Sequence, residues 1–325
     1  MPELDQKTTL LGGQAVIEGV MMRFGGSVAT AVRRADGTIQ VRKETYVPLA
    51  ERYFFLKLPV LRGAVGLVEM LGVGIRALNF SAELAVQDTD PGAKPASQGK
   101  RNAALGLTVI ISFLAAIALF FALPLYVATA ALDVEQQPFL FNLIAGGIRV
   151  TVFLGYLLLL SMMKDIHRLF QYHGAEHKTV FAMETDGNLT IAACRAQSRF
   201  HPRCGTSFLL VVMVVAIVLF AFLDAFLIQQ LGKITLALRL ATHLPLLPLV
   251  LGVAYEFVRF SARHADSALG RLVVAPGLWL QRITTKEPDD AQIEVAVAAL
   301  RAAIGHGPSE DALERAMTAQ AISVN

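Results

Sequence analysis

The chain has 325 residues, of which 54% are hydrophobic and 17% are charged. Soluble domains carry about 25% charged residues, so this composition excludes a disordered chain and argues against an ordinary cytosolic enzyme. The formal net charge is only +3, which argues against a nucleic-acid partner. The excess of apolar residues points to the lipid bilayer as the partner. Since the first residues do not resemble a signal peptide, we expect the membrane segments inside the chain.

The predicted cytoplasmic N-terminal segment, residues 1–101, contains a strand signal. Larger side chains alternate with small ones from Val28 to Val32, and the alternation resumes at Ile39 after an Asp36-Gly37 turn. Alternation around Asp-Gly is typical of two antiparallel strands joined by a tight turn. The segment is therefore predicted to contain a β-hairpin.

Residues 58–80 are apolar except for one polar stripe. Arg62, Glu69 and Arg76 follow one another at seven-residue spacing, so they share one face of a helix. An amphipathic helix of this kind is typical of the membrane interface, and we predict that it lies on the bilayer rather than crossing it. Residues 88–100 contain several Pro, Gly and Ser residues and are predicted to form a linker.

Four segments are apolar and long enough to cross the bilayer: 103–130, 139–163, 207–231 and 240–257. They divide the remaining chain into a first transmembrane pair (102–163), a metal-motif loop (164–206), a second transmembrane pair (207–258) and a C-terminal helical tail (259–325). Lys and Arg are frequent in the 164–206 loop and absent from the 132–138 loop. This distribution predicts that both termini and the 164–206 loop lie on the cytoplasmic side of the inner (plasma) membrane.

The C-terminal tail contains a helix signal. Pro288-Asp289-Asp290 is typical of a helix start, and the apolar residues Ile293 and Leu300 recur on one face after it. We predict a helix from this point to about residue 304. A short second helix is expected after residue 308.

The 164–206 loop holds two pairs of potential metal ligands. His173 and His177 are four residues apart, which places both imidazoles on one face of a helix, within reach of one ion. Glu176 completes the pattern H-x-x-E-H, in which a glutamate beside two histidine ligands acts as general base for a hydrolytic water. Gly174 lowers the helix propensity of this stretch by about 1 kcal/mol relative to alanine.

His201 and Cys204 form the second pair, in the sequence His-Pro-Arg-Cys-Gly. Two ligand-type residues three apart and followed by glycine are typical of a zinc knuckle, because a tight turn directs both side chains to one point. We therefore predict that these residues bind a metal together with His173 and His177. Zinc is the default ion, and another divalent transition metal is the alternative. Without a metal, His201 and Cys204 would cap the following span and the other histidines would line an interfacial helix.

Four protein ligands and three imply different roles. A closed tetrahedral site would be structural, whereas an open position would allow Glu176 to activate water. The sequence leaves both interpretations open. A further alternative, a transporter, is suggested by three ionisable residues within or at the ends of spans, since intramembrane charges are usually functional or paired: Arg149, Asp224 and Glu256.

A glycine-rich block at residues 12–23 places Glu18 in apolar surroundings. A carboxylate there carries a desolvation cost unless it meets a cation or a metal. One interpretation puts Gln14, Glu18 and Arg23 at the metal site or facing a substrate, with Glu18 as a second catalytic carboxylate. The other pairs Glu18 with Arg23 or Arg62 and gives it a structural role.

These blocks together resemble the YqhQ-like family of bacterial integral membrane proteins, which have no defined function and are described as predicted metal-dependent enzymes. The resemblance rests on GGQAVIEGVMMR at 12–23, FQYHGAEHKTV at 170–180, SRFHPRCGTSFL at 198–209 and PGLWLQRITTKEPDD at 276–290. It implies an integral membrane protein with a metal site and no established substrate.

The predicted fold is a mainly α, polytopic membrane protein with about four transmembrane helices and a small cytoplasmic α+β part that contains the N-terminal β-hairpin. The first function hypothesis is metal-dependent hydrolysis of a membrane-borne substrate, with Glu176 and Glu18 as catalytic residues and metal ligands drawn from His173, His177, His201 and Cys204. The alternative is a membrane scaffold or assembly factor, held by a structural zinc clamp, that binds protein partners on the cytoplasmic side.

Overall fold

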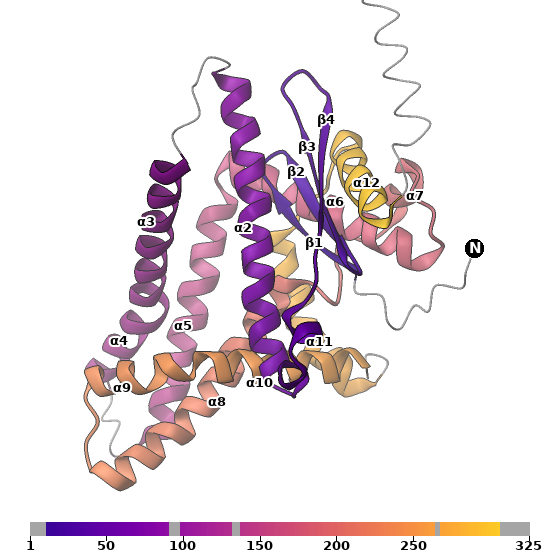
Figure 1. Ribbon diagram of the computed structural model, residues 1–325. Helices are drawn as coiled ribbons and strands as arrows, with labels where there is room; N and C mark the ends of the chain where they lie inside the picture. The colour runs from indigo at the N-terminus through magenta and orange to yellow at the C-terminus, as the bar shows by residue number, and fades with distance from the viewer. Residues whose placement is uncertain (1–10, 91–97, 132–136, 264–266, 306–325) are drawn as a thin grey trace, which may run out of the picture.

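The computed structural model describes residues 11–90, 98–131, 137–263 and 267–305, and most of them are helical (Figure 1). The N-terminal part is a four-stranded antiparallel sheet in the order β1-β2-β3-β4. The strands are β1 (Leu11–Val16), β2 (Gly19–Phe24), β3 (Ser27–Arg33) and β4 (Ile39–Thr45). The predicted hairpin is confirmed as β3 and β4, which pair on either side of the Asp36-Gly37 turn. The two strands before it were not predicted, because two glycines interrupt β1 and the apolar run of β2 shows no alternation with polar residues.

The sheet is the middle layer of three. Alternate residues, such as Val20 and Ala29, face a core shared with α6 (Lys164–Thr185) and α12 (Asp290–Ile304). The intervening residues, such as Met21 and Val28, face α2 (Leu61–Thr89). The two-residue period of the strands therefore buries both faces, with α2 on one side and α12 on the other (Figure 1).

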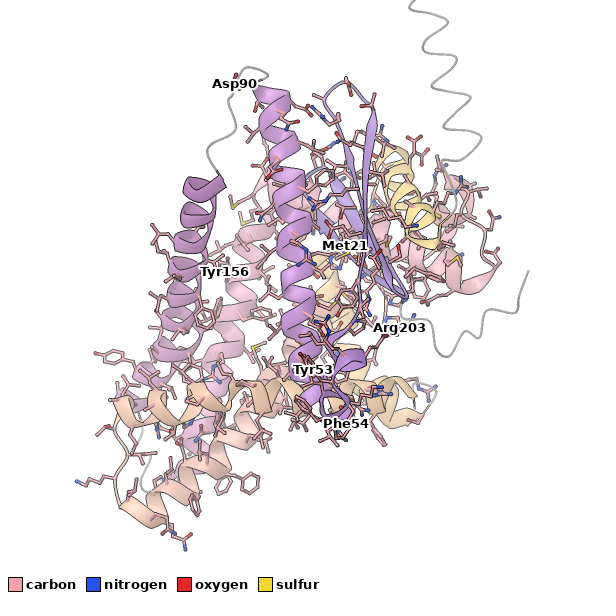
Figure 2. The ribbon with its side chains drawn as sticks, viewed as in Figure 1. Met21, Tyr53, Phe54, Asp90, Tyr156 and Arg203 are labelled. Atoms are coloured by element: carbon pink, nitrogen blue, oxygen red, sulfur yellow. The ribbon has the colours of Figure 1, made fainter. Side chains whose placement is uncertain are left out.

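The helix α2 extends beyond the end of the predicted amphipathic helix, and the predicted linker is correspondingly shorter. Asp88 and Thr89 still belong to α2, and α3 (Gln98–Ile117) includes the last residues of the predicted linker. The remainder of that linker, 91–97, lies outside the described residues. Two short helices, α1 (Leu49–Arg52) and η1 (Phe54–Lys57), lead into α2. Figure 2 shows Tyr53 and Phe54 at this end of α2 and Asp90 at the other, and Phe54 is 83% exposed.

Four helical segments of the described chain are long and apolar enough to cross a membrane, in agreement with the prediction: Gly106–Ala130, Pro138–Ser161, Gly205–Leu231 and Leu236–Phe260. The first contains α3, the π-helical turn η2 (Ala118–Ala122) and α4 (Leu123–Ala131). The second is α5 (Pro138–Ser161) and the third is α8 (Gly205–Leu231). The fourth runs through α9 (Leu236–His243), η3 (Leu244–Leu246) and α10 (Leu247–Arg263). The protein is therefore membrane-associated.

The first span is irregular at Pro124. Proline has no backbone N–H, so it cannot donate to the carbonyl of Phe120, four residues earlier. The helix widens into η2 just before this position, and the Nε of Arg149 on α5 donates to the Phe120 carbonyl at 2.8 Å. Arg149 therefore supplies the hydrogen bond that proline removes, and its guanidinium lies 5.0 Å from the centre of the Phe121 ring.

The layer on the face of the sheet opposite α2 consists of α6, α12 and the short helix α7 (Ile191–Ala196), which packs against both. The helix α11 (Ala268–Thr284) packs against the spans α8, α10 and α5 instead. The predicted C-terminal helix is confirmed as α12, which Asp289 caps by accepting from the N–H of Gln292. Its residues Ile293 and Leu300 are buried against the sheet. The second short helix predicted after residue 308 lies outside the described residues.

Candidate metal centre

Three side chains from α6 and the start of α8 meet at one point. One donor atom from each of His173, His177 and Cys204 lies within 4.8 Å of the other two. The Nε2 of His173 is 3.3 Å from the Sγ of Cys204, and the two imidazole centres are 4.4 Å apart. Zinc binds histidine nitrogen at about 2.1 Å and cysteine sulfur at about 2.3 Å, so one ion can contact both atoms at this separation. His173, His177 and Cys204, called the three-residue group below, are therefore a donor set that fits a transition metal.

Both histidines in this three-residue group turn their Nδ1 atoms to backbone carbonyls. The Nδ1 of His173 is 2.8 Å from the carbonyl oxygen of Thr284, and that of His177 is 2.6 Å from the carbonyl oxygen of Arg199. A carbonyl only accepts, so each Nδ1 carries the proton and each Nε2 keeps its lone pair. Metal-binding histidines are held in this way. Burial also lowers the pKa of His177, which favours the neutral form that a metal needs.

Glu176 lies beside the three-residue group. Its Oε2 is 4.0 Å from the Nε2 of His173. The backbone N–H of Gly13 on β1 donates to its carboxylate, which is buried. Burial raises the pKa of Glu176, and the neighbouring His173 and His201 act in the opposite direction. A Cβ at Gly13 would come within 2.9 Å of the Cγ of Glu176, so glycine is what allows β1 to cover this side chain.

Gly174 has a similar role on α6. A Cβ at this position would lie 2.1 Å from the carbonyl oxygen of Lys286. The N–H of Lys286 donates to the carbonyl of Phe170 at 2.8 Å, which joins the segment after α11 to α6. Gly174 does not interrupt the helix, and it permits the close approach that brings Thr284 to His173.

The structure places His201 next to the three-residue group rather than in it. The Nδ1 of His201 accepts from the N–H of Arg203 at 3.3 Å, and its Nε2 is 3.3 Å from the Oε2 of Glu184. Burial lowers the pKa of His201 to about 4, so the ring is neutral near pH 7 and donates from Nε2 to Glu184. Both nitrogens are therefore engaged. The ring centre lies 5.7 Å from that of His177, and three of the four predicted ligands come together.

Gln281 on α11 holds the His201–Cys204 turn, a role that sequence reasoning missed. Its fully buried side chain accepts from the N–H of His201 at 2.7 Å. It also donates to the carbonyl of His201 at 2.8 Å and to the hydroxyl of Ser207 at 3.1 Å. Gln281 and Thr284 are three residues apart, so they share one face of α11. The spacing of these two polar residues within the 276–290 block was the only feature of the sequence that could have indicated this role of Gln281.

Glu18 lies in the turn between β1 and β2, with a positive φ of 51°. Its carboxylate accepts two hydrogen bonds from the guanidinium of Arg168 on α6, one of them from Nη2 at 2.6 Å. It also accepts from the hydroxyl of Tyr172 at 3.2 Å. The expected pairing with Arg23 or Arg62 is wrong, because the β1–β2 turn rests on the first turns of α6.

The other residues of the N-terminal block lie against α2 and the segment around it. The side chain of Gln14 packs against Gly74, where a Cβ would come within 2.2 Å of its Oε1. The guanidinium of Arg23 lies 4.4 Å from the centre of the Tyr46 ring. The structure thus brings neither residue to the three-residue group, and from this block only the backbone of Gly13 reaches Glu176.

Comparison with known proteins agrees with the family resemblance. A sequence model of the family described as "Protein of unknown function (DUF1385)" matches residues 58–306. The chain belongs to this family. It is 34% identical over 294 residues to the uncharacterized protein YqhQ of Bacillus subtilis (strain 168), which covers 88% of this chain and 89% of that protein. No solved structure matches the chain.

Proposed function

We propose that the three-residue group binds a divalent transition metal, with zinc as the default, and that the protein is a metal-dependent hydrolase at the membrane surface. The arrangement of His173 and His177 carries this proposal: each Nδ1–H is bonded to a carbonyl, and Cys204 lies beside the Nε2 atoms. Histidine and cysteine are ligands that zinc prefers. Three protein ligands would leave one coordination position for water or substrate.

The side chains around the group suit the chemistry of hydrolysis. A metal bound there would supply a Lewis acid for a carbonyl or phosphoryl oxygen. Glu176 would act as the general base toward the attacking water, because it lies close to the donor atoms and burial raises its pKa above the ordinary value, which makes its carboxylate a stronger base. The catalytic role of Glu18 stays a prediction. Its contacts with Arg168 and Tyr172 support a positioning role, in which it holds the β1–β2 turn against α6.

The position of the group supports a substrate at the membrane. The helix α6 follows the second span almost directly, and Cys204 is the N-cap of the third. The group therefore lies at the shared end of these two spans. The concentration of Lys and Arg in residues 164–206 supports the cytoplasmic side of the plasma membrane for this end. A lipid-linked or other membrane-borne molecule would reach a site in this place.

Metal analysis of the purified full-length protein tests the ligand set. We expect His173→Ala, His177→Ala and Cys204→Ser each to lose the bound metal, and His201→Ala to retain it. Loss of metal in all four variants would favour a closed four-ligand clamp. A wild-type protein that holds no transition metal after purification without chelators, and takes none up, would refute the site.

Glu176→Gln tests the catalytic role. We expect this variant to keep the metal and to lose hydrolysis of p-nitrophenyl ester or phosphate probes. We also expect that this variant does not complement a strain that lacks the gene. Asp165→Asn changes another carboxylate of α6 that is exposed, and it serves as the matched control. Full function of Glu176→Gln with normal metal content would exclude the general-base role.

A structural zinc clamp in a scaffold or assembly factor is the second candidate. Burial of the group favours it, since His177 is 2% and Cys204 is 8% exposed. The group also ties α6 to α8 and, through Thr284, to α11. In this case the ligand variants would lower the yield of folded protein, while Glu176→Gln would have no effect.

A further inference from the structure

A second group of polar side chains lies among the membrane-spanning helices. Asp224 on α8 is fully buried, and Arg239 and His243 on α9 are 2% and 1% exposed. Asn142 on α5 donates to the Oδ2 of Asp224 at 2.7 Å. The Nη2 of Arg239 is 3.3 Å from the same oxygen. One carboxylate oxygen is therefore contacted by two neighbouring helices.

This polar group is separate from the metal centre. Cys204 caps the N-terminus of α8, and Asp224 lies two turns before its end at Leu231. At a rise of about 1.5 Å per residue, Cys204 and Asp224 are roughly 30 Å apart along the helix, which is about the thickness of the hydrocarbon core. The two sites therefore lie near opposite faces of the membrane.

The second carboxylate oxygen of Asp224 faces His243. Its Oδ1 is 3.4 Å from the Nε2 of His243. The hydroxyl of Thr242 has one hydrogen, which it donates to the carbonyl of Leu238 at 2.9 Å. Its oxygen therefore accepts from the Nδ1 of His243 at 3.1 Å. In its neutral form, His243 is thus protonated on Nδ1 and presents the lone pair of Nε2 to Asp224.

Two acceptor atoms consequently face each other in a buried site. Neither the Oδ1 of Asp224 nor the Nε2 of His243 has a hydrogen-bond partner among the described residues. The contact becomes a hydrogen bond when one proton lies between them, carried by either the imidazole or the carboxyl group. We propose that Asp224 and His243 form a proton-binding site within the membrane. Its ligand is one proton from the aqueous phase, and uptake raises the charge of the polar group by one.

Charged, polar and aromatic side chains of the helices packed against the pair act on this proton. Arg239 from α9 and Arg149 from α5 both add positive charge. The amide of Asn142 favours the ionised carboxylate, and the ring of Phe220 on α8 excludes water at 4.3 Å from the centre of His243. The two arginines and the amide oppose uptake, whereas exclusion of water from the carboxylate favours it. The site is therefore without the extra proton in alkaline solution and takes it up as the nearby face of the membrane becomes more acidic, as in the proton relays of membrane proteins.

Nitrogen NMR of the full-length, ¹⁵N-histidine-labelled protein in lipid nanodiscs tests the site, with His243→Gln to assign the signals. At high pH we expect His243 to carry a proton on Nδ1 and none on Nε2. At lower pH the nitrogen shift of Nε2 should show either a bound proton or a hydrogen bond accepted from the carboxyl group of Asp224. Asp224→Asn removes the negative charge and should shift this titration to lower pH. Asn142→Leu removes a hydrogen bond to the carboxylate and should shift it to higher pH by roughly one unit.

Controls separate this site from the surface and from the metal centre. His167→Gln removes an exposed histidine of α6 and should leave the His243 titration unchanged. All of these variants should keep the metal content of the wild type. An Nε2 that carries no proton and accepts no hydrogen bond at every pH at which the protein is folded would overturn the proposal. If Asp224→Asn does not fold, an Asn142→Leu variant that titrates as the wild type does would overturn it equally.

Discussion

Gly174 is the position at which α6 comes closest to the segment after α11. A Cβ there would lie 2.1 Å from the backbone oxygen of Lys286, whereas ordinary contacts begin at 3.4 Å. In Gly174→Ala this segment must therefore move away by about 1.3 Å, since neither backbone can yield as a flexible side chain does. Overpacking of this kind costs about 1 to 3 kcal/mol, and the better helix propensity of alanine offsets about 1 kcal/mol. We expect a net loss of up to about 2 kcal/mol in the free energy of unfolding.

The same displacement reaches the metal centre. Thr284 is two residues before Lys286, and its carbonyl accepts the 2.8 Å hydrogen bond from the Nδ1 of His173. A shift of about 1 Å would take this pair beyond hydrogen-bond distance. Loss of such a supporting contact typically lowers metal affinity 10- to 100-fold, so we expect Gly174→Ala to bind zinc at least about ten times more weakly.

Two measurements check this reasoning: thermal unfolding in detergent and zinc affinity by competition with a chelator. Gly66→Ala is the matched control, because Gly66 lies inside α2 and a Cβ there meets nothing within 4 Å. This control should be as stable as the wild type or gain up to about 1 kcal/mol. A Gly174→Ala protein with the stability and zinc affinity of the wild type would show that the α6 contact does not control the site.

Four other expectations follow from particular contacts. Gln281→Leu removes three hydrogen bonds around the His201 turn and should lower the free energy of unfolding by about 2 to 4 kcal/mol, together with the metal content; unchanged denaturation would contradict this. A double-mutant cycle of Glu18→Gln and Arg168→Ala should give a coupling below about 1 kcal/mol, because the side chains are 33% and 48% exposed. Loss of hydrolysis in Glu18→Gln at unchanged stability would support its predicted catalytic role instead. Arg34 holds the pKa of Asp88 below its ordinary value of 3.8, so this pair stabilises the fold above that pH and the contribution is lost as the pH falls through the folded-state pKa. Asp88→Asn should therefore lower the Tm at pH 7 but not in acid, and a difference that persists in acid would argue against the pair. The Trp279→Phe background lacks the only tryptophan of the sequence. In this background, brominated lipid chains should quench the tryptophan fluorescence of Val68→Trp and Leu71→Trp, on the exposed side of α2, more than that of Val41→Trp on β4. Equal quenching at these positions would show that α2 does not lie on the membrane surface.

The sequence by itself determined the features that depend on neighbouring residues. Four runs of apolar residues were enough to identify the spans, because length and composition decide whether a helix can cross a bilayer. The Asp36-Gly37 turn predicted its hairpin, and the four-residue spacing of His173 and His177 placed both rings on one helix face.

Only the tertiary structure decided which side chains meet. Glu18 pairs with Arg168, 150 residues away, and not with the nearer arginines that sequence reasoning considered. Cys204 reaches the two histidines, whereas His201, three residues before it, is held by Gln281 and Glu184. The direction of a side chain in a turn depends on the segments packed around it, and those segments come from distant parts of the chain. A spacing pattern can thus indicate which residues are able to bind a metal, but packing selects the ones that face it.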